Sequence, residues 1–211
     1  MAIYLKKFET QAAYEAAQSG LILPNVSLTV DNNTVHYNPS SPIPPTPPLF
    51  CKLTSKFVGT IVIDGSGELT ENMIWDSVDE KYEIESVEIG ILCTSIGDNV
   101  FNNCQSLTSC TISNSVTSIG YNAFGDCLSL TSIDIPNSVT SIGDGAFYMN
   151  NSELTELTSV TVRATTPPTL GSDAFGNNAS GRKIYVPSTS VGTYKSATNW
   201  STYASDIEPI S

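Results

Sequence analysis

Apolar and polar positions repeat along the chain with a period of 23 residues between residues 84 and 152. The copies run over 84–106, 107–129 and 130–152, and a fourth, looser copy at 157–182 follows a short insertion. The same residue types return at the same place in each copy: Ile96, Ile119 and Ile142, then Phe101, Phe124 and Phe147. Such recurrence predicts a repeat array, in which each copy stacks on its neighbours.

Within one copy, the pattern predicts two short strands and a corner. Apolar and polar residues alternate in the first strand, which places Ile133 and Ile135 on one face and Ser132 and Asp134 on the other. A second strand is expected around each Val-Thr-Ser-Ile-Gly sequence, and the Ala-Phe pair after it predicts a short helical turn that carries the phenylalanine inward. Stacked copies would form parallel ladders with rungs about 4.8 Å apart. Because no copy can cover its own apolar face, the array needs a cap at each end.

The repeated pattern L-x-x-I-x-I-P-x-x-V-x-x-I-G-x-x-A-F-x-x-C over 107–152 resembles the leucine-rich repeats of BspA-like bacterial surface proteins, also called the Treponema pallidum type. The flanking segments at 57–70 and 183–187 are similar to the entry and closing segments of those proteins. The resemblance implies a β-rich solenoid, a leucine-rich-repeat right-handed β/α superhelix with short helical turns. It also implies a surface used for adhesion or binding, and it offers no catalytic residue to carry over.

Shifts in composition divide the 211-residue chain into five segments. A helix at 8–19 and a hairpin over 26–37 are expected in a leading α+β module, which is too small for a core of its own. We expect this module to form a homo-oligomer, to bind a neighbouring chain, or to bind nothing. Six prolines over 39–48 predict an extended, semi-rigid spacer. The expected segments are the module at 1–38, a Pro-rich linker at 39–50, an N-terminal cap at 51–83, the repeats at 84–182 and a C-terminal cap at 183–211.

The chain is acidic, with a formal net charge of −12 from 9 basic and 21 acidic residues. An acidic protein repels the phosphates of nucleic acids and the headgroups of anionic lipids, so neither is an expected partner. No stretch is long and apolar enough to predict membrane insertion. Residues 1–20 hold no apolar core typical of a signal peptide, which leaves open a removed leader, another export route or a location inside the cell.

Residues that would support catalysis or metal binding are scarce. The single histidine, His36, lies outside the repeats, and no Ser-His-acid or Cys-His set can be assembled around them. The five cysteines show no C-x-x-C spacing, so no zinc or redox motif is indicated. Cys104 and Cys127 occupy equivalent places and Cys110 takes an inward strand position, which predicts buried thiols. We therefore expect no enzyme activity, no cofactor and no metal.

Five outward strand positions are the candidate binding residues. They form one row across the predicted ladder: Glu88, Thr111, Asp134, Thr161 and Tyr185. Solenoid faces of this kind serve as extended binding surfaces. The predicted function is therefore non-catalytic binding of an extracellular protein or glycan by a secreted or cell-surface protein. The alternative is a structural or tail-associated protein of a phage or prophage, in which residues 1–38 anchor the chain and the array is displayed.

Overall fold

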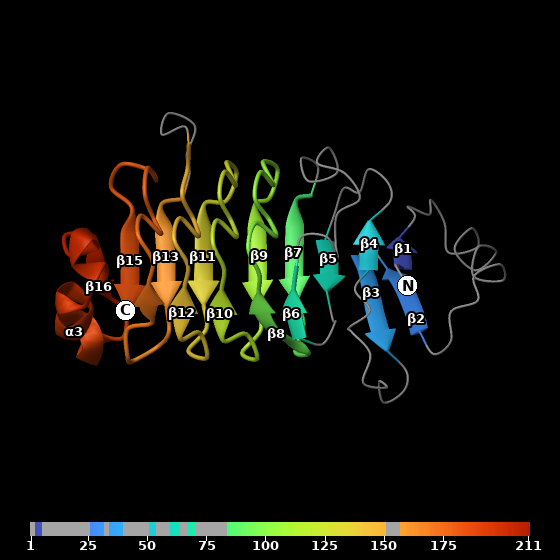
Figure 1. Cartoon of the computed structure of the whole chain (residues 1–211), viewed down its shortest axis with the longest axis horizontal. Helices are drawn as coiled ribbons and strands as arrows, with labels where there is room; N and C mark the ends of the chain where they lie inside the picture. The colour runs from blue at the N-terminus through green and yellow to red at the C-terminus, as the bar shows by residue number, and fades with distance from the viewer. Residues whose placement is uncertain are drawn as a thin grey trace.

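The protein is an elongated parallel β-solenoid in the computed structural model (Figure 1). Residues 67–70, 84–150 and 157–211 are described in full, and five strands before them are described by their backbone. These five strands are β1 (Ile3–Leu5), β2 (Val26–Asp31), β3 (Thr34–Pro39), β4 (Cys51–Leu53) and β5 (Thr60–Ile63). The solenoid that the repeat period predicts is thereby confirmed.

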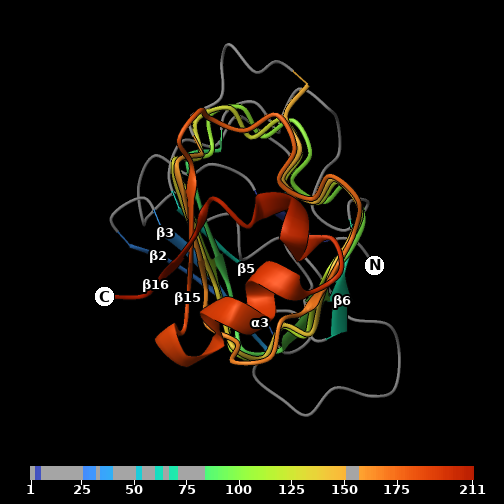
Figure 2. The same ribbon diagram turned by 90° about the vertical axis from the view of Figure 1, so that its left-hand side faces the viewer.

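Parallel strands form two walls that face each other across the core (Figure 2). The first wall contains β7 (Ser86–Ile89), β9 (Ser109–Ile112), β11 (Ser132–Ile135), β13 (Ser159–Val162), β15 (Lys183–Val186) and β16 (Ile207–Pro209). The second wall contains β6 (Gly67–Leu69), β8 (Cys93–Ile96), β10 (Ser118–Ile119), β12 (Ser141–Ile142) and β14 (Thr169–Leu170). Viewed along the axis, successive copies share one outline, as stacking in register requires (Figure 2).

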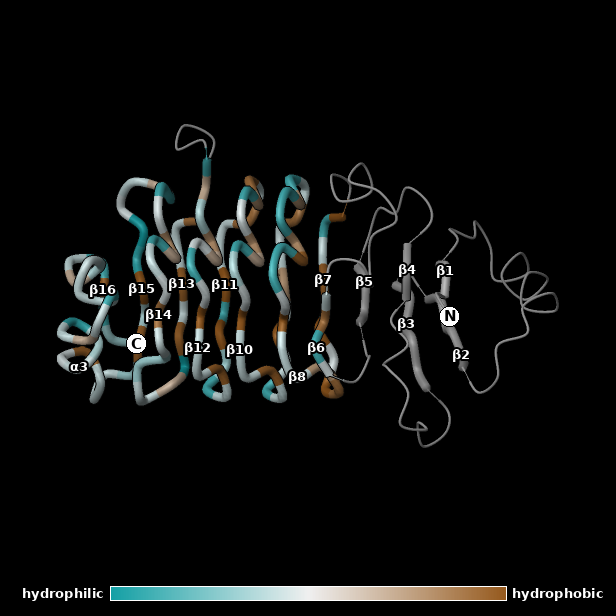
Figure 3. Tube along the Cα trace, viewed as in Figure 1, coloured by the Kyte–Doolittle hydropathy of each residue, from teal (hydrophilic) through white to brown (hydrophobic). Residues whose placement is uncertain are grey.

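Register places equivalent residues of successive copies side by side. In the second wall Ile119 pairs with Ile96 on one side and with Ile142 on the other. In the first wall Val87 pairs with Cys110, and exposed and buried residues alternate along β9 and β11 as the sequence pattern predicts. Apolar positions therefore recur at the same level of each copy (Figure 3).

A column of stacked phenylalanine rings fills the corner between the two walls. The ring centroids of Phe101, Phe124, Phe147 and Phe175 are separated by 5.1, 5.2 and 5.3 Å in turn, and each neighbouring pair is stacked. All four side chains are 0% exposed. These separations lie in the favourable range for aromatic pairs, so the column contributes both buried apolar area and ring–ring attraction.

Backbone hydrogen bonds between copies hold the same corner. Phe101 N donates to Ala123 O at 2.8 Å, and Phe124 N donates to Ala146 O at 2.7 Å. The short helical turn expected here is a hydrogen-bonded turn instead, and among the described residues of the repeats no helix is present. Asn122 adopts a φ of 50°, a left-handed conformation that asparagine tolerates and that turns the chain too tightly for a regular helix.

A column of glycines lets the second wall pass closely from one copy to the next. A Cβ atom added at Gly143 would lie 2.7 Å from the carbonyl carbon of Gly120, and one added at Gly171 would lie 2.4 Å from that of Gly143. These neighbours are backbone atoms, which cannot rotate away. Glycine is therefore required at this place in each copy by close approach alone.

Aromatic side chains of the C-terminal cap cover the last copy. Trp200 Nε1 donates to Pro168 O at 2.7 Å, and the Tyr194 hydroxyl donates to Ala164 O at 2.8 Å. Both aromatic side chains are 0% exposed. The cap contains the 3-10 helices η2 (Ser188–Ser190) and η3 (Trp200–Tyr203) and the helix α3 (Val191–Ser196). The last ring of the phenylalanine column, Phe175, packs against Trp200 of the cap, with 5.9 Å between the ring centroids.

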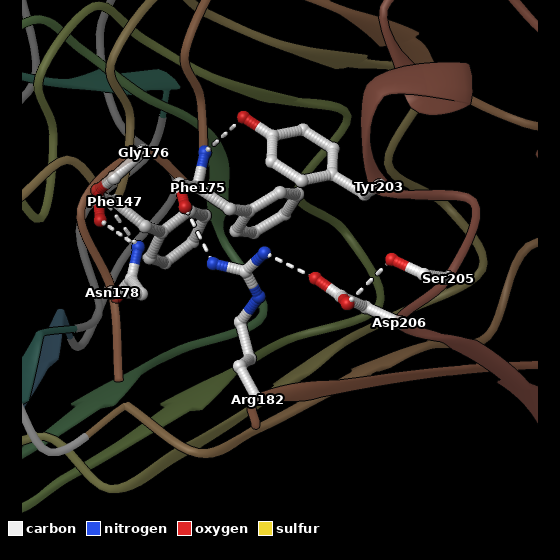
Figure 4. A network of polar contacts seen from close by, with 8 residues as sticks. All are labelled: Phe147, Phe175, Gly176, Asn178, Arg182, Tyr203, Ser205 and Asp206. Carbon is white, nitrogen blue, oxygen red and sulfur yellow. Dashed lines mark hydrogen bonds and ion pairs between the residues drawn. The ribbon is translucent and has the colours of Figure 1, made fainter. Parts of the chain in front are cut away.

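Arg182 ties the cap to the phenylalanine column (Figure 4). Its guanidinium donates to Phe175 O and to the Asp206 carboxylate, the latter at 2.7 Å, and lies 5.0 Å from the ring centroid of Tyr203. The Tyr203 hydroxyl accepts a hydrogen bond from Phe175 N at 3.2 Å. Because the Arg182 side chain is only 8% exposed, loss of Asp206 alone would leave an uncompensated charge in the interior.

The hairpin expected in the leading segment is confirmed and extends the first wall. Strands β2 and β3 are antiparallel, with Leu28 paired to Tyr37, and β3 pairs in parallel with β5 through Val35 and Ile61. The expected helix at 8–19, the linker at 39–50 and most of the expected N-terminal cap lie outside the described residues. The segment boundaries therefore remain predictions.

We expect Phe124→Ala to lower the free energy of unfolding by about 3–5 kcal/mol, because it opens a cavity in the middle of the aromatic column. Chemical denaturation followed by circular dichroism measures this loss. The matched control is Tyr121→Ala, since Tyr121 is 53% exposed and its truncation should change stability by no more than about 0.5 kcal/mol. Equal losses for the two variants would show that the column does not hold the copies together.

We expect Gly143→Ala to destabilise the protein by about 1–3 kcal/mol, because the added methyl group would press on the backbone of the preceding copy. Gly192→Ala is the control, since a Cβ atom there meets nothing within 4 Å and alanine favours α3 by about 0.5–1 kcal/mol. Thermal melts of the two variants should move in opposite directions, and a shared direction would contradict the close-approach argument.

Candidate binding site

The five outward residues of the first wall lie in register, with one interruption. Glu88 pairs with Thr111 between β7 and β9, and Asp134, Thr161 and Tyr185 pair in turn across β11, β13 and β15. Glu88, Thr111 and Asp134 are exposed, whereas Thr161 and Tyr185 are half-buried. The structure thus brings the predicted residues together in two groups, one of two residues and one of three. Their role in binding remains a prediction.

The interruption is a break in the first wall between β9 and β11. These two strands end separate sheets and are not paired, whereas the second wall continues through β8, β10, β12 and β14 at the same level. Elsewhere in the first wall, Thr108 N donates to Glu85 O and Thr158 N donates to Thr131 O, each bond joining successive copies. Figure 1 shows β9 and β11 set farther apart than β11 and β13.

Proline weakens one end of the β9–β11 pair. Arg163 N donates to Ile135 O at 2.9 Å at the end of the β11–β13 pair, and Ile210 N donates to Val186 O at 2.8 Å at the end of the β15–β16 pair. Pro136 stands at the same place in its own copy and has no N–H to donate to the strand before it. The β9–β11 pair therefore lacks a hydrogen bond that the β11–β13 and β15–β16 pairs possess. Pro187 stands at the same place after β15, yet β13 and β15 remain paired in register, so the missing N–H does not by itself produce the break.

A cleft of about 600 Å³ occupies the break. We call it the β9–β11 cleft. It is lined by Cys110, Thr111, Ile112, Asn114, Asp134, Pro136, Asn137 and Arg163. Cys110 and Ile112 are 9% and 8% exposed, whereas the equivalent Ile133 and Ile135 of the next copy are 2% and 0% exposed. The missing strand contact thus opens a narrow approach to the edge of the core.

An ion pair forms one side of the cleft. Arg163 Nε donates to Asp134 Oδ1 at 3.0 Å, and Arg163 Nη2 donates to Asp134 Oδ2 at 2.6 Å. The hydrogen bond from this carboxylate raises the pKa of Arg163 above its usual value. About half of each side chain is exposed, so the pair adds little to stability. In the cleft, the pair places a carboxylate beside a guanidinium, and their opposite charges offset each other.

Two exposed amides lie at the end of the cleft. Asn114 and Asn137 occupy equivalent positions in the loops after β9 and β11. Each loop is fastened by the next residue, because Ser115 Oγ donates to Cys93 O and Ser138 Oγ donates to Val116 O, both at 2.7 Å. Within the described part of the chain, neither asparagine side chain has a hydrogen-bond partner. Each amide can therefore both donate to and accept from a ligand.

Buried thiols lie beneath the cleft. Cys93, Cys104, Cys110 and Cys127 are buried and form no disulfide with one another. Burial and the nearby Cys104 raise the pKa values of Cys110 and Cys127, and Cys127 Sγ donates to Phe101 O at 3.2 Å. Such thiols stay protonated at neutral pH, so they pack as small apolar groups rather than act as nucleophiles. Among the residues described in full, no group of three or more His, Cys, Asp and Glu is arranged to hold a metal.

Strand alternation identified Thr111 and Asp134 but missed Asn114, Asn137 and Arg163. The two asparagines lie in loops, and Arg163 follows the last residue of β13. The recurrence of asparagine one period apart was the signal for the amides. No residue pattern revealed the break itself, because a proline at the same place, Pro187, follows β15 without breaking its pairing with β13.

Comparisons with known proteins agree with the repeat pattern. The model of the BspA type leucine rich repeat region matches residues 74–202 in six copies, which is more than half of the chain. A search of curated proteins found no match. In the described part of the chain, no helix has the length and apolar content to cross a membrane.

Three solved structures of bacterial repeat proteins resemble this chain. A leucine-rich repeat protein of Bacteroides ovatus is 21% identical over 76% of this chain, with a TM-score of 0.49. One of Eubacterium ventriosum is 23% identical over 63% of this chain, with a TM-score of 0.43. A leucine rich cell surface protein of Faecalibacterium prausnitzii is 25% identical over 78% of this chain, with a TM-score of 0.44. The matches cover 40%, 40% and 38% of those chains, so this chain spans about two fifths of their length.

We expect the free energy of unfolding to fall as pH rises above the usual thiol pKa of 9.0. The native pKa values of Cys110 and Cys127 are raised, so the unfolded chain loses these protons first, at about 1.4 kcal/mol per pH unit for each thiol. Urea titrations from pH 7 to pH 10.5 measure this slope. Cys110→Val places at this site the residue type of the equivalent position in the preceding copy, Val87. The variant should reduce the slope of unfolding free energy against pH, and an unchanged slope would contradict the raised pKa of Cys110.

Proposed function

Since this chain belongs to the BspA-type leucine-rich repeat family, we propose that it is a non-catalytic repeat protein that binds an extracellular protein or glycan at the cell surface. Leucine-rich repeat arrays generally serve as protein-binding scaffolds, and their extended faces offer many contacts along one axis. The observation that carries the proposal is the outward face of the first wall. Its exposed residues take no part in the core, and they remain in register on both sides of the β9–β11 cleft.

The chemistry of the face favours binding over catalysis. A general base or nucleophile needs a tuned pKa and a partner within hydrogen-bond reach. The face offers hydroxyls, amides and two ion pairs, Asp134–Arg163 and Lys183–Glu208, and the thiols beneath it are held protonated by burial. These groups recognise a ligand through hydrogen bonds without transforming it. The net charge of −12 adds a preference for neutral or basic partners.

The face of the first wall differs from that of the second. Glycines recur along the second wall from Gly97 to Gly171, so much of its outer surface is backbone, with Tyr121 as an exposed exception. The first wall instead carries longer side chains, among them Asp134, Arg163 and Tyr185. Variable side chains on a regular frame are the feature by which solenoids distinguish ligands.

We expect Asp134→Ala and Tyr185→Ala each to weaken the Kd for a captured ligand by about 5- to 10-fold, as loss of a polar or aromatic contact at an interface does. Immobilised protein is first screened against extracellular matrix proteins and glycans, and affinities are then measured by surface plasmon resonance. Tyr121→Ala, on the second wall, is the control and should bind as the unchanged protein does. Normal binding by both first-wall variants would show that the ligand uses another face.

A further inference from the structure

We propose that the β9–β11 cleft binds one sugar residue of a neutral glycan chain. The inference rests on the proposed binding function and assigns the class of ligand and the place where it binds. It follows from five properties of the cleft, which are its shape, its hydrogen-bonding groups, its charge, its floor and its position along the row.

The shape of the cleft suits a small unit rather than a protein surface. Its volume of about 600 Å³ lies within the range of about 300–1,000 Å³ typical of small-molecule sites. Protein interfaces depend instead on broad contact areas with aromatic or arginine anchors at their centre. No aromatic residue lines this cleft, and its single arginine is already engaged by Asp134.

The polar groups of the cleft match the hydroxyl groups of a sugar. A hydroxyl both donates and accepts, so it pairs best with groups that offer both functions side by side. The amides of Asn114 and Asn137 do so, and the Asp134–Arg163 pair places an acceptor next to a donor. The Thr111 hydroxyl adds a further group of the same kind.

Charge excludes anionic ligands from the same site. The Arg163 guanidinium makes three hydrogen bonds to Asp134, so its charge is balanced within the protein. The nearest outward residue on β7 is Glu88, an exposed acid in register with Thr111. An entering uronate or sulfate would face a balanced pair and a negative neighbour, whereas a neutral sugar meets no repulsion.

The floor of the cleft is apolar. Cys110, Ile112 and Pro136 line it. The break leaves Cys110 and Ile112 slightly exposed to solvent. A pyranose ring presents one face of C–H groups between its hydroxyls. That face can pack over the small apolar area that Cys110 and Ile112 expose, while the hydroxyls reach the amides above, so polar and apolar groups are both matched.

The row beyond the cleft can hold further sugar residues. Thr161 and Tyr185 follow Asp134 in register, and successive strands in such a ladder lie about 4.8 Å apart. A sugar ring in an extended glycan advances the chain by a similar length. A chain anchored in the cleft would therefore pass along the row and bring a ring over Tyr185, whose aromatic side chain is half-buried and offers a stacking surface.

The test measures binding of the full chain to immobilised oligosaccharides by surface plasmon resonance. Neutral cellulose-, mannan- and chitin-derived oligosaccharides are compared with polygalacturonate and heparin fragments, and with a panel of extracellular matrix proteins. We expect capture by a neutral oligosaccharide and no capture by the anionic ones. The double variant Asn114→Ala, Asn137→Ala should weaken the Kd by about 10-fold, because hydrogen bonds within the cleft are lost.

Two controls separate the outcomes. Asn177→Ala removes an exposed asparagine near the C-terminal cap and should leave the Kd unchanged, while thermal melts check that all variants fold. Glycan binding that the double variant leaves intact would overturn the cleft assignment but leave the proposed function standing. Binding of matrix proteins alone, or of anionic glycans alone, would overturn the neutral-glycan inference. Failure to capture any protein or glycan would count against the proposed function as well.

Discussion

The spacing of the phenylalanine column sets the distance between copies, and the rest of the solenoid conforms to it. Ring separations of 5.1 to 5.3 Å are only slightly larger than the spacing of strands in a sheet, about 4.8 Å. One translation therefore satisfies ring stacking and backbone hydrogen bonding together. Because Phe101, Phe124, Phe147 and Phe175 are all fully buried, the column also supplies the apolar area that no single copy can bury alone.

This continuity explains how the first wall can break without dividing the array. Between the copies that contain β9 and β11, strands β10 and β12 of the second wall stay paired, Phe124 N donates to Ala146 O, and the rings of Phe124 and Phe147 remain stacked. The two copies therefore stay connected through the second wall and the phenylalanine corner, and only the strand pairing of the first wall is lost. The cost of the break is thereby limited to the edge of the core, where Cys110 and Ile112 become slightly exposed.

The sequence predicted what depends on the period and on local alternation. The inward isoleucines, the phenylalanine column and the buried cysteines follow from such patterns, and the structure confirms each of them. The corner was expected as a helical turn, since an Ala-Phe pair does not reveal the left-handed backbone at Asn122. The break was not predicted, because a proline after the strand occurs both at the break, as Pro136, and as Pro187, where β13 and β15 stay paired. The local pattern therefore does not locate the break.

Position 163 shows how a departure from the repeat can create a site. Arg163 stands where the copy before it has Pro136, so the β11–β13 pair regains the N–H that the β9–β11 pair lacks. The same substitution supplies a side chain that reaches back across one strand to Asp134 and forms one side of the cleft. Arg163 therefore restores the terminal hydrogen bond that Pro136 cannot make, and it also provides polar groups beside the opening. Inward positions are constrained by the column and cannot vary in this way, so specificity must reside at the outward and loop positions where neighbouring copies differ.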